Sequence, residues 1–354
     1  MNNYAIKPFD VKNASAEEYR VANVFFNQMR AEQLPNDPPM PLEEQTQSFR
    51  NIPDFVEVHA WGVWNAGESG LIAAGTLALL RMEENKHVGE ISIEVLPQYR
   101  RQGIAHRLLA LIAETARREN RRLLIGDTSE RIPAGEVFMQ RLGAQRGLEN
   151  HTNQLDLTEL NHNTLVNDWL ASAQERGADF ELGFWDGVYP EEDIYAIAEL
   201  YRVMNSAPRG TLDVADFQYT PEFLRQEEKE MLARGTERWT LYVREKSTGK
   251  FAGYTEVMWN ANRAEILNQG ATGVFPNYRN KGLGRWLKAA MLDKILGERT
   301  QVKYIRTGNA DSNAPMLKIN HELGFKPYIS RCVWQIETAE VLEYLTHHQP
   351  AIPA

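Results

Sequence analysis

The chain alternates between two hydrophobic periods, and it does so twice in the same order. In the first half, a predicted strand and an amphipathic helix precede three strands, a glycine turn, a helix and a further strand. These elements are Tyr4 to Phe9, Ala16 to Gln33, Val56 to Trp64, Leu71 to Leu80, His87 to Val95, a helical stripe from Ile104 to Ala116, and Leu123 to Ile125. Strands that alternate with helices predict an α/β fold, with a mixed sheet flanked by helices.

The second half shows the same change of period. Its predicted elements are a strand from Phe180 to Phe184, helices near Glu192 to Met204 and Pro221 to Arg234, strands near Trp239 to Arg244, Phe251 to Met258 and Ala264 to Val274, a helical stripe from Leu283 to Ile295, and a strand from Tyr304 to Thr307. Gly297 follows the helical stripe and is predicted to cap it, because glycine favours the end of a helix.

A sequence repeat lies at the glycine turn of each half. The segment from Val95 to Ala105 recurs as Val274 to Gly284, with valine, proline, tyrosine, arginine and the first glycine in place. A second match, in which Leu142-Gly143 corresponds to Leu323-Gly324, follows at nearly the same offset. Two matches with similar offsets predict two tandem domains. We place them at residues 1–160 and 179–345, joined by a linker helix over residues 161–178.

Length and composition narrow the class of protein. The 354 residues suffice for about two domains, and 43% hydrophobic with 25% charged residues are typical of a globular protein. A net charge of -9 argues against a nucleic-acid partner. The single cysteine excludes an internal disulfide framework, and the eight histidines show no spacing typical of metal ligands. With no secretory signal and no apolar run long enough for a membrane span, we expect a cytoplasmic location and no membrane partner.

The second glycine turn predicts an anion-binding loop. Gly282 and Gly284 allow backbone N–H groups to turn toward one point, and the start of the following helix adds partial positive charge. Arg279, Lys281 and Arg285 add formal charges, which favours a diphosphate over a carboxylate. For a single copy, a plain strand-to-helix turn with a solvated basic rim would explain the same residues. The presence of two copies favours the binding interpretation.

The pattern Val-x-Pro-x-Tyr-Arg-x-x-Gly-x-Gly, followed by a helix, a strand and Leu-Gly-Phe, resembles the GNAT family of N-acetyltransferases. The tandem layout is similar to that of mycothiol synthase and other double-domain members. The resemblance implies two tandem acetyltransferase-type domains and acetyl-CoA as cosubstrate, with its pyrophosphate on the loop and its pantetheine arm on the preceding strand. The cofactor-binding residues that it implies are Val274, Arg279, Asn280, Lys281, Gly282, Leu283, Gly284, Arg285, Asn309 and Asn313 in the second copy, and Val95, Arg100, Arg101, Gln102, Gly103, Ala105 and His106 in the first.

The resemblance also implies where the chemistry takes place. The backbone N–H of Val274 is the expected donor to the thioester carbonyl. An aliphatic amine is mostly protonated at neutral pH, and freeing it costs about 4–5 kcal/mol, so a base is needed. Glu256 and Glu265 are the candidates in the second copy, and Glu90 and Glu94 in the first. For each of the four, an ordinary exposed carboxylate on a strand is the alternative interpretation.

Two departures from the family pattern stand out. Where many members place a tyrosine that protonates the leaving thiolate, this chain has Asn320 in the second copy and Met139 in the first. Water, Tyr304 or Tyr328 then remains as the proton source. In the first copy Ala105 replaces the second glycine and no asparagine corresponds to Asn313, so that site either binds acetyl-CoA without turnover or is vestigial. We therefore assign catalysis to the second copy.

The resemblance therefore implies an N-acetyltransferase that moves an acetyl group directly to a primary amine of a small molecule. Two alternatives stay open. In one, both domains bind acyl-CoA without turnover and the protein is a sensor or an assembly partner. In the other, the acceptor is an amine of a protein or peptide. The chain is expected to act as a monomer or a homodimer.

Overall fold

The computed structural model describes residues 4–172 and 178–348. Within these residues the chain forms two compact units. The first unit comprises residues 4–149, 209–215 and 331–348, and the second comprises residues 150–172, 178–208 and 216–330.

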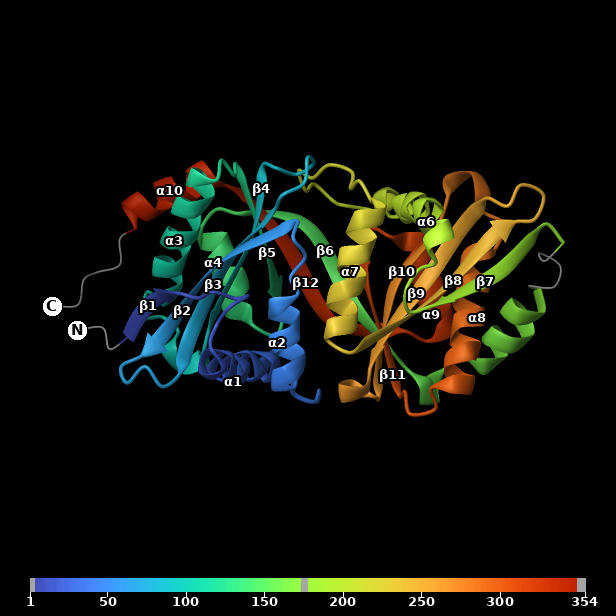
Figure 1. Cartoon of the computed structure of the whole chain (residues 1–354), viewed down its shortest axis with the longest axis horizontal. Helices are drawn as coiled ribbons and strands as arrows, with labels where there is room; N and C mark the ends of the chain where they lie inside the picture. Colours follow the sequence, from blue (N-terminus) through green and yellow to red (C-terminus); the bar gives the residue numbers. More distant parts are fainter. Residues whose placement is uncertain (1–3, 173–177, 349–354) are drawn as a thin grey trace. The chain divides into compact units, whose positions relative to one another are not determined.

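The first unit is built mainly from the first half of the sequence (Figure 1). Its elements are β1 (Tyr4–Pro8), α1 (Ala16–Gln33), α2 (Leu42–Arg50), β2 (Val56–Asn65), β3 (Leu71–Leu80), β4 (Val88–Val95), η1 (Pro97–Tyr99), α3 (Ile104–Arg118), β5 (Leu123–Ser129), α4 (Pro133–Arg141), residues 331–337 of β12 (Lys326–Glu337) and α10 (Thr338–His347). In Figure 1 the red α10 lies against α3, where the two helices pack together.

The second unit repeats this order of elements. They are residues 150–156 of β6 (Gln145–Asp156), η2 (Leu157–Glu159), η3 (Thr164–Leu170), β7 (Phe180–Asp186), η4 (Glu191–Asp193), α6 (Ile194–Tyr201), η5 (Arg202–Ser206), α7 (Pro221–Ala233), β8 (Thr236–Glu245), β9 (Phe251–Asn260), η6 (Ala261–Arg263), β10 (Ile266–Val274), η7 (Pro276–Tyr278), α8 (Leu283–Glu298), β11 (Tyr304–Ala310) and α9 (Ala314–Leu323).

Each unit takes one strand from the other half of the sequence. The strand order is β1-β2-β3-β4-β5-β12 in the first unit and β6-β11-β10-β9-β8-β7 in the second. Residues 331–337 of β12 pair antiparallel with β5, and residues 150–156 of β6 pair antiparallel with β11. The predicted ranges 1–160 and 179–345 therefore differ from the two units, because a local hydrophobic pattern does not reveal which sheet a strand joins.

Helices cover both faces of the sheet in each unit. Adjacent residues on a strand point to opposite faces, and in the first unit Ala73 packs with Leu108 of α3 while Ala74 packs with Phe25 of α1. In the second unit, Val257 of β9 belongs to the cluster that contains α8, and Tyr254 belongs to the cluster that contains α6. The predicted α/β class with mixed sheets is confirmed.

Most predicted elements are present, and three predictions need comment. Helix α2 was not predicted, because its sequence Leu-Glu-Glu-Gln-Thr-Gln-Ser-Phe-Arg has only two apolar residues. Gly297 does not cap α8, which continues to Glu298 and has Arg299 at its C-cap. The expected linker helix over residues 161–178 is represented by η3, whose Leu165 and Trp169 pack in the core of the second unit. Residues 173–177 of that range lie outside the described residues.

Candidate active site

The sheet of the second unit opens between β10 and β11. The parallel pairing of these strands runs from Ile266 opposite Tyr304 to Gln269 opposite Thr307 and ends there. A β-bulge follows immediately, because the pairing of β10 with β9 shifts by one residue between Gln269 and Thr272. The Gln269 side chain donates to the Glu256 carbonyl at 2.7 Å and so satisfies a backbone group at the bulge. The last residues of β10 are thus free of a partner strand on the β11 side.

A cavity of about 510 Å³ lies at this opening. Its lining residues come from η5, the end of β10, the loop before α8, the first turn of α8 and α9, and they include Arg279, Arg285 and Lys318 but no carboxylate. The lining residues are Val203, Met204, Ser206, Ala207, Pro208, Thr272, Gly273, Val274, Tyr278, Arg279, Asn280, Gly282, Leu283, Gly284, Arg285, Ser312, Asn313, Pro315, Met316, Lys318 and Ile319. Cations at a cavity without a lining acid favour an anionic ligand.

The loop before α8 presents backbone N–H groups to this cavity. Asn280 and Gly282 both adopt the left-handed conformation, with φ of 63° and 74°. Gly282 is the N-cap of α8, and its position has no side-chain capping bond. The N–H groups of the first helical turn, at Leu283, Gly284 and Arg285, are therefore available to an anion. This agrees with the loop geometry expected from the sequence.

The three predicted cations of the loop differ in their surroundings. Arg279 donates to the Val274 carbonyl at 3.0 Å and to the Ser206 hydroxyl at 2.7 Å, so its charge is not neutralised by these contacts. Arg285 forms a bidentate pair with Glu322, at 3.0 Å for both bonds. Lys281 does not line the cavity.

Aromatic rings account for the position of Lys281. Its ammonium group lies over the Phe180 and Tyr278 rings, at 5.2 and 5.8 Å from their centroids. Among the predicted loop cations, Arg279 is therefore the one best placed to pair with a ligand phosphate. Sequence reasoning did not identify Lys318 or Ser206, both of which line the cavity.

The backbone of β10 directs the Val274 N–H toward the opening. The next N–H along the strand, of Phe275, donates to the Ala252 carbonyl on β9 at 2.9 Å. Neighbouring N–H groups on a strand point to opposite edges. The Val274 N–H therefore points away from β9, as required of a donor to a thioester carbonyl in the opening.

Of the two predicted asparagines, Asn313 lines the cavity and Asn309 lies on β11 without lining it. Asn313 caps α9, with its side chain accepting from the Met316 N–H at 3.4 Å. Asn309 lies on β11, beyond the last pair with β10, and accepts a hydrogen bond from Asn320 at 2.7 Å. Asn320, which stands where the family resemblance places a tyrosine, is 1% exposed.

Glu256 is the candidate base that lies beside the bulge. Its carboxylate accepts from the Tyr201 hydroxyl at 2.7 Å and from the Ala271 N–H at 3.3 Å, on the face of the sheet covered by α6. Burial raises the pKa of Glu256, while the bond from Tyr201 lowers it. A raised pKa brings a carboxyl group closer to the range useful for a base at neutral pH. Glu256 does not itself line the cavity; Thr272, which pairs with the preceding Thr255, does.

The structure separates the other predicted candidates from the opening. Glu265 precedes β10 at the end opposite Val274, is exposed, and pairs with Lys303 at 2.6 Å. The proposed role of Glu265 as a base is therefore not supported. Tyr304 lies at the same remote end, opposite Ile266. The Tyr328 hydroxyl accepts a hydrogen bond from Arg306 at 3.3 Å.

The equivalent turn of the first unit has the same backbone but a different charge. Arg101 and Gly103 have φ of 62° and 78°, close to the values at Asn280 and Gly282. Arg100 donates to the Val95 carbonyl at 3.0 Å, as Arg279 does to Val274, but its other donors form a bidentate pair with Glu32, at 2.7 and 2.5 Å. The charge expected to hold a phosphate is thus neutralised within the protein.

Two further residues of this turn are directed elsewhere. The Gln102 side chain donates to the Gln98 carbonyl at 3.2 Å. The His106 ring lies 6.1 Å from the ring of Tyr344 on α10, and burial lowers its pKa. His106 is therefore turned toward α10, which speaks against the predicted phosphate contact.

The opening of the first sheet is narrower. The parallel pairing of β4 with β5 also ends early, at Glu90 opposite Ile125, but β4 pairs with β3 without a bulge. A Cβ atom at Gly126 would lie 3.1 Å from the Ile91 side chain. At the corresponding Gly308 of the second unit, a Cβ atom would have no neighbour within 4 Å.

Of the two carboxylates predicted on β4, Glu94 is half-buried and Glu90 is exposed at the strand surface. Desolvation, aided by the charge of Asp127, raises the pKa of Glu90 and raises that of Glu94 to about 7. One Glu94 oxygen is buried without a hydrogen-bond partner among the described residues. The repeat aligns Glu94 with Gly273, so this carboxylate has no counterpart in the second unit.

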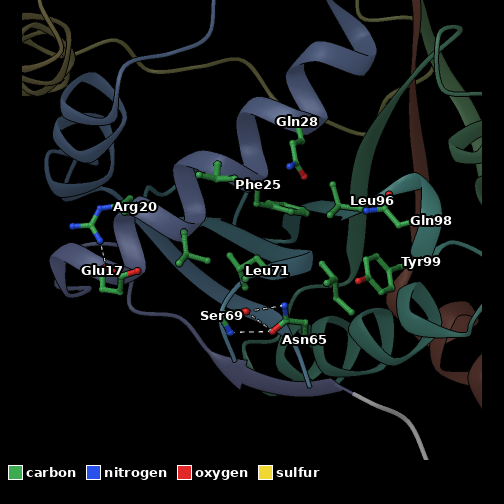
Figure 2. A pocket seen from close by; sticks show the side chains of 14 residues that line it. Glu17, Arg20, Phe25, Gln28, Asn65, Ser69, Leu71, Leu96, Gln98 and Tyr99 are labelled. Atoms are coloured by element: carbon green, nitrogen blue, oxygen red, sulfur yellow. Dashed lines mark hydrogen bonds and ion pairs between the residues drawn. The ribbon is translucent and has the colours of Figure 1, made fainter. Parts of the chain in front are cut away.

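A cavity of the first unit lies on the α1 side of its sheet. This cavity has a volume of about 380 Å³. Figure 2 shows its lining residues, which include Phe25, Leu71 and Tyr99. None of the loop residues from Arg100 to Ala105 lines this cavity. It is therefore not the counterpart of the cavity at Arg279.

Comparison with known proteins identifies the fold of the chain and the family of one of its segments. Residues 26–144 match the acetyltransferase (GNAT) family model. The chain is 25% identical to a tandem GNAT protein from the clavulanic acid biosynthesis pathway, with a TM-score of 0.75 over 95% of this chain and 98% of that one. It also resembles a GCN5-related N-acetyltransferase from Sphaerobacter thermophilus, with 12% identity and a TM-score of 0.62 over 96% of both chains.

A third similar structure is a glucosamine N-acetyltransferase region of a fungal multi-domain β-N-acetylglucosaminidase. It has 11% identity and a TM-score of 0.65 over 94% of this chain and 38% of that one. No curated protein matches the chain. The two units thus define a duplicated acyltransferase-type fold. By these matches residues 26–144 form a GNAT acetyltransferase domain, and the whole chain resembles a protein with two tandem GNAT domains.

The described residues contain neither a helix that could span a membrane nor a cluster of metal-binding side chains. In residues 4–172 and 178–348, no helix has the length and apolar character needed to cross a membrane. The same residues contain no group of three or more histidine, cysteine or acidic side chains arranged to hold a metal ion.

Proposed function

We propose that the second unit transfers an acetyl group from acetyl-CoA to a primary amine of a small molecule. The observation that carries this proposal is the cation-lined cavity at the opening between β10 and β11. Its loop offers N–H groups and Arg279 to a diphosphate, and the free edge of β10 offers hydrogen bonds to the pantetheine arm.

The proposed reaction is a direct transfer. The amine nitrogen forms a bond to the acyl carbon, the carbon–sulfur bond breaks, and its electron pair leaves on the thiolate. The proton that the nitrogen loses as it becomes an amide passes through water to this thiolate. The Val274 N–H stabilises the oxygen of the tetrahedral intermediate. The ammonium proton of the acceptor passes through water to Glu256, whose pKa burial raises.

The amine acceptor is supported by charge and by the need for a base. The chain carries a net charge of -9, which favours a cationic partner. The acceptor enters from the α6 side, where Val203 and Met204 line the cavity and Glu256 lies beside the bulge. We further propose that the protein is cytoplasmic and acts as a monomer or a homodimer.

The test is release of free CoA from acetyl-CoA with aminoglycosides, polyamines, amino acids and short peptides as acceptors. We expect release with one class of small amine, and a loss of at least tenfold in kcat in Glu256→Gln. Release with peptides alone would redirect the proposal to a protein acceptor. No release with any amine, while acetyl-CoA binds, would contradict the enzyme and favour a binding protein.

A further inference from the structure

A chain of three polar side chains crosses the α8 side of the second unit. Lys288 on α8 donates from Nζ to Asn320 Oδ1 at 2.7 Å, and Asn320 on α9 donates from Nδ2 to Asn309 Oδ1 at 2.7 Å. Lys288 is 4% exposed and Asn320 1%. Each link is a short hydrogen bond between groups on different elements.

Lys288 fixes the donor-to-acceptor direction of both hydrogen bonds. In its ammonium form, which prevails below about pH 7, Lys288 has donors and no acceptor, so Asn320 turns its oxygen toward Lys288. The Asn320 amide nitrogen then faces Asn309 as a donor, and the Asn309 oxygen accepts its hydrogen bond. Asn153 reinforces this orientation by donating to the same Asn309 oxygen at 3.4 Å. The Asn309 Nδ2 is thereby turned away from α9 as a hydrogen-bond donor.

Asn309 does not itself line the cavity, but it lies on β11 beside residues that do. It follows Thr307, the last β11 residue paired with β10, and Gly308, beside which the space is open. The cavity-lining residues Ser312 and Asn313 come just after it on the chain, and Ile319, the neighbour of Asn320, also lines the cavity. The series of hydrogen bonds from Lys288 through Asn320 thus ends, at Asn309, near the opening of the sheet.

Burial of the Lys288 ammonium group costs free energy, and one hydrogen bond to an amide offsets only part of that cost. Its charge is removed from water, with the Phe325 ring 5.6 Å from Nζ as a further partner. Burial lowers the pKa of Lys288 to about 7. Apolar side chains at positions 288 and 320 would fill the same space, but they would leave Asn309 free to rotate.

We infer that Lys288 and Asn320 are positioning residues, which hold the Asn309 amide so that its nitrogen donates to a carbonyl oxygen of the pantetheine arm. The inference rests on the proposed function, because it requires the arm to lie in the opening between β10 and β11. It assigns the position held by tyrosine in many relatives to orientation of the cosubstrate, and Asn320 itself has no proton to give to the thiolate.

The variant Asn320→Asp should reverse the donor and acceptor of the hydrogen bond between residues 320 and 309, with little change in the shape of the side chain. Aspartate accepts from Lys288 and, as an acceptor, draws the Asn309 nitrogen toward itself, so that the Asn309 oxygen faces the arm. Calorimetric titration would compare two ligands, acetyl-CoA and 3′-phospho-ADP, which has the nucleotide of CoA but no arm. We expect about tenfold weaker binding of acetyl-CoA and unchanged binding of 3′-phospho-ADP.

The comparison of ligands separates positioning from charge and from folding. An added negative charge would weaken both anionic ligands alike, and a damaged fold would do the same. Asn309→Ala, at a half-buried position, provides a second variant with the same selective loss expected. Asn120→Asp, in the first unit, is the matched control and should bind both ligands as the wild type does.

The outcomes are distinct. A selective loss for acetyl-CoA in Asn320→Asp, or in Asn309→Ala if the first variant does not fold, supports the inference. Equal effects on both ligands, or none, overturn it while the proposed function stands. If the wild-type protein binds 3′-phospho-ADP no more weakly than acetyl-CoA, the arm gains no contacts in the opening and the inference fails. If the wild type binds neither, the proposed function fails with it.

Discussion

The two glycine turns have nearly the same backbone and different chemistry. Both have left-handed residues at equivalent positions, and in both an arginine donates to the carbonyl of the last strand residue. In the first unit the other donors of that arginine pair with the Glu32 carboxylate, whereas in the second a further donor bonds the neutral Ser206 hydroxyl. A conserved loop shape within one chain is thus no guarantee of a working anion site, because partners from distant elements decide its charge.

The strand openings differ in a similar way. In the second unit a bulge and Gly270 stand where the first unit has a regular strand and Ile91. The Ile91 side chain lies against Gly126, whereas the space beside Gly308 is open. The first unit therefore has the outline of the site with its opening narrowed by an apolar side chain. Four predictions test this comparison.

The largest effect is expected from Gly282→Glu. A side chain at φ of 74° is strained by about 1–2 kcal/mol, and its carboxylate would face the diphosphate. We expect acetyl-CoA affinity to fall more than a hundredfold by calorimetry. Gly103→Glu has the same strain in the first unit and should leave the affinity unchanged. Equal losses in both variants would mean that the first unit also holds the cosubstrate.

The second prediction concerns the buried carboxylate that the second unit lacks. Burial raises the pKa of Glu94 to about 7, so between pH 4.5 and 7 the folded state keeps a proton that the unfolded chain releases. Stability from this group is therefore lost as the pH rises through that window. Glu94→Gln should remove a pH-dependent loss of about 3 kcal/mol, measured by chemical denaturation at pH 4.5 and 7.5. Parallel stability curves for the two proteins would argue against it.

The third prediction compares the effects of removing each of the two arginines. Arg279→Ala should weaken acetyl-CoA binding about tenfold, because one charge-assisted contact to a phosphate is lost. Arg100→Ala should leave binding unchanged and lower the stability by about 1 kcal/mol, because Glu32 loses its partner. Titration and denaturation of both variants check this, and reversed effects would contradict our assignment of the site.

The smallest effect is expected from Gly284→Ala, which gives the second loop the residue of the first. A Cβ atom at Gly284 would lie 3.7 Å from Ile319 and 3.9 Å from Val274, an ordinary contact. We expect a change of less than threefold in acetyl-CoA affinity. A large loss would show that Ala105, and not the charge at Arg100, is the main defect of the first loop.

The sequence predicted best what depends on neighbours along the chain. The bounds of α1 from Ala16 to Gln33, the Asn313 cap and the conformation of the glycine turns all follow from local pattern and turn chemistry. It could not predict pairs between distant elements. Nothing near Arg285 indicates that Glu322 neutralises it, and nothing near Lys281 indicates the rings that it covers.

The exchange of strands sets the order in which the protein can fold during synthesis. Strand β5 of the first unit pairs with residues 331–337, which leave the ribosome long after residues 4–149 of that unit. At about 5–20 residues per second, the intervening chain takes on the order of ten to forty seconds to make. During that time the nascent first unit has an unpaired strand edge, a hazard for aggregation that chaperones act upon. A protein shortened before β12 would keep that exposed edge permanently.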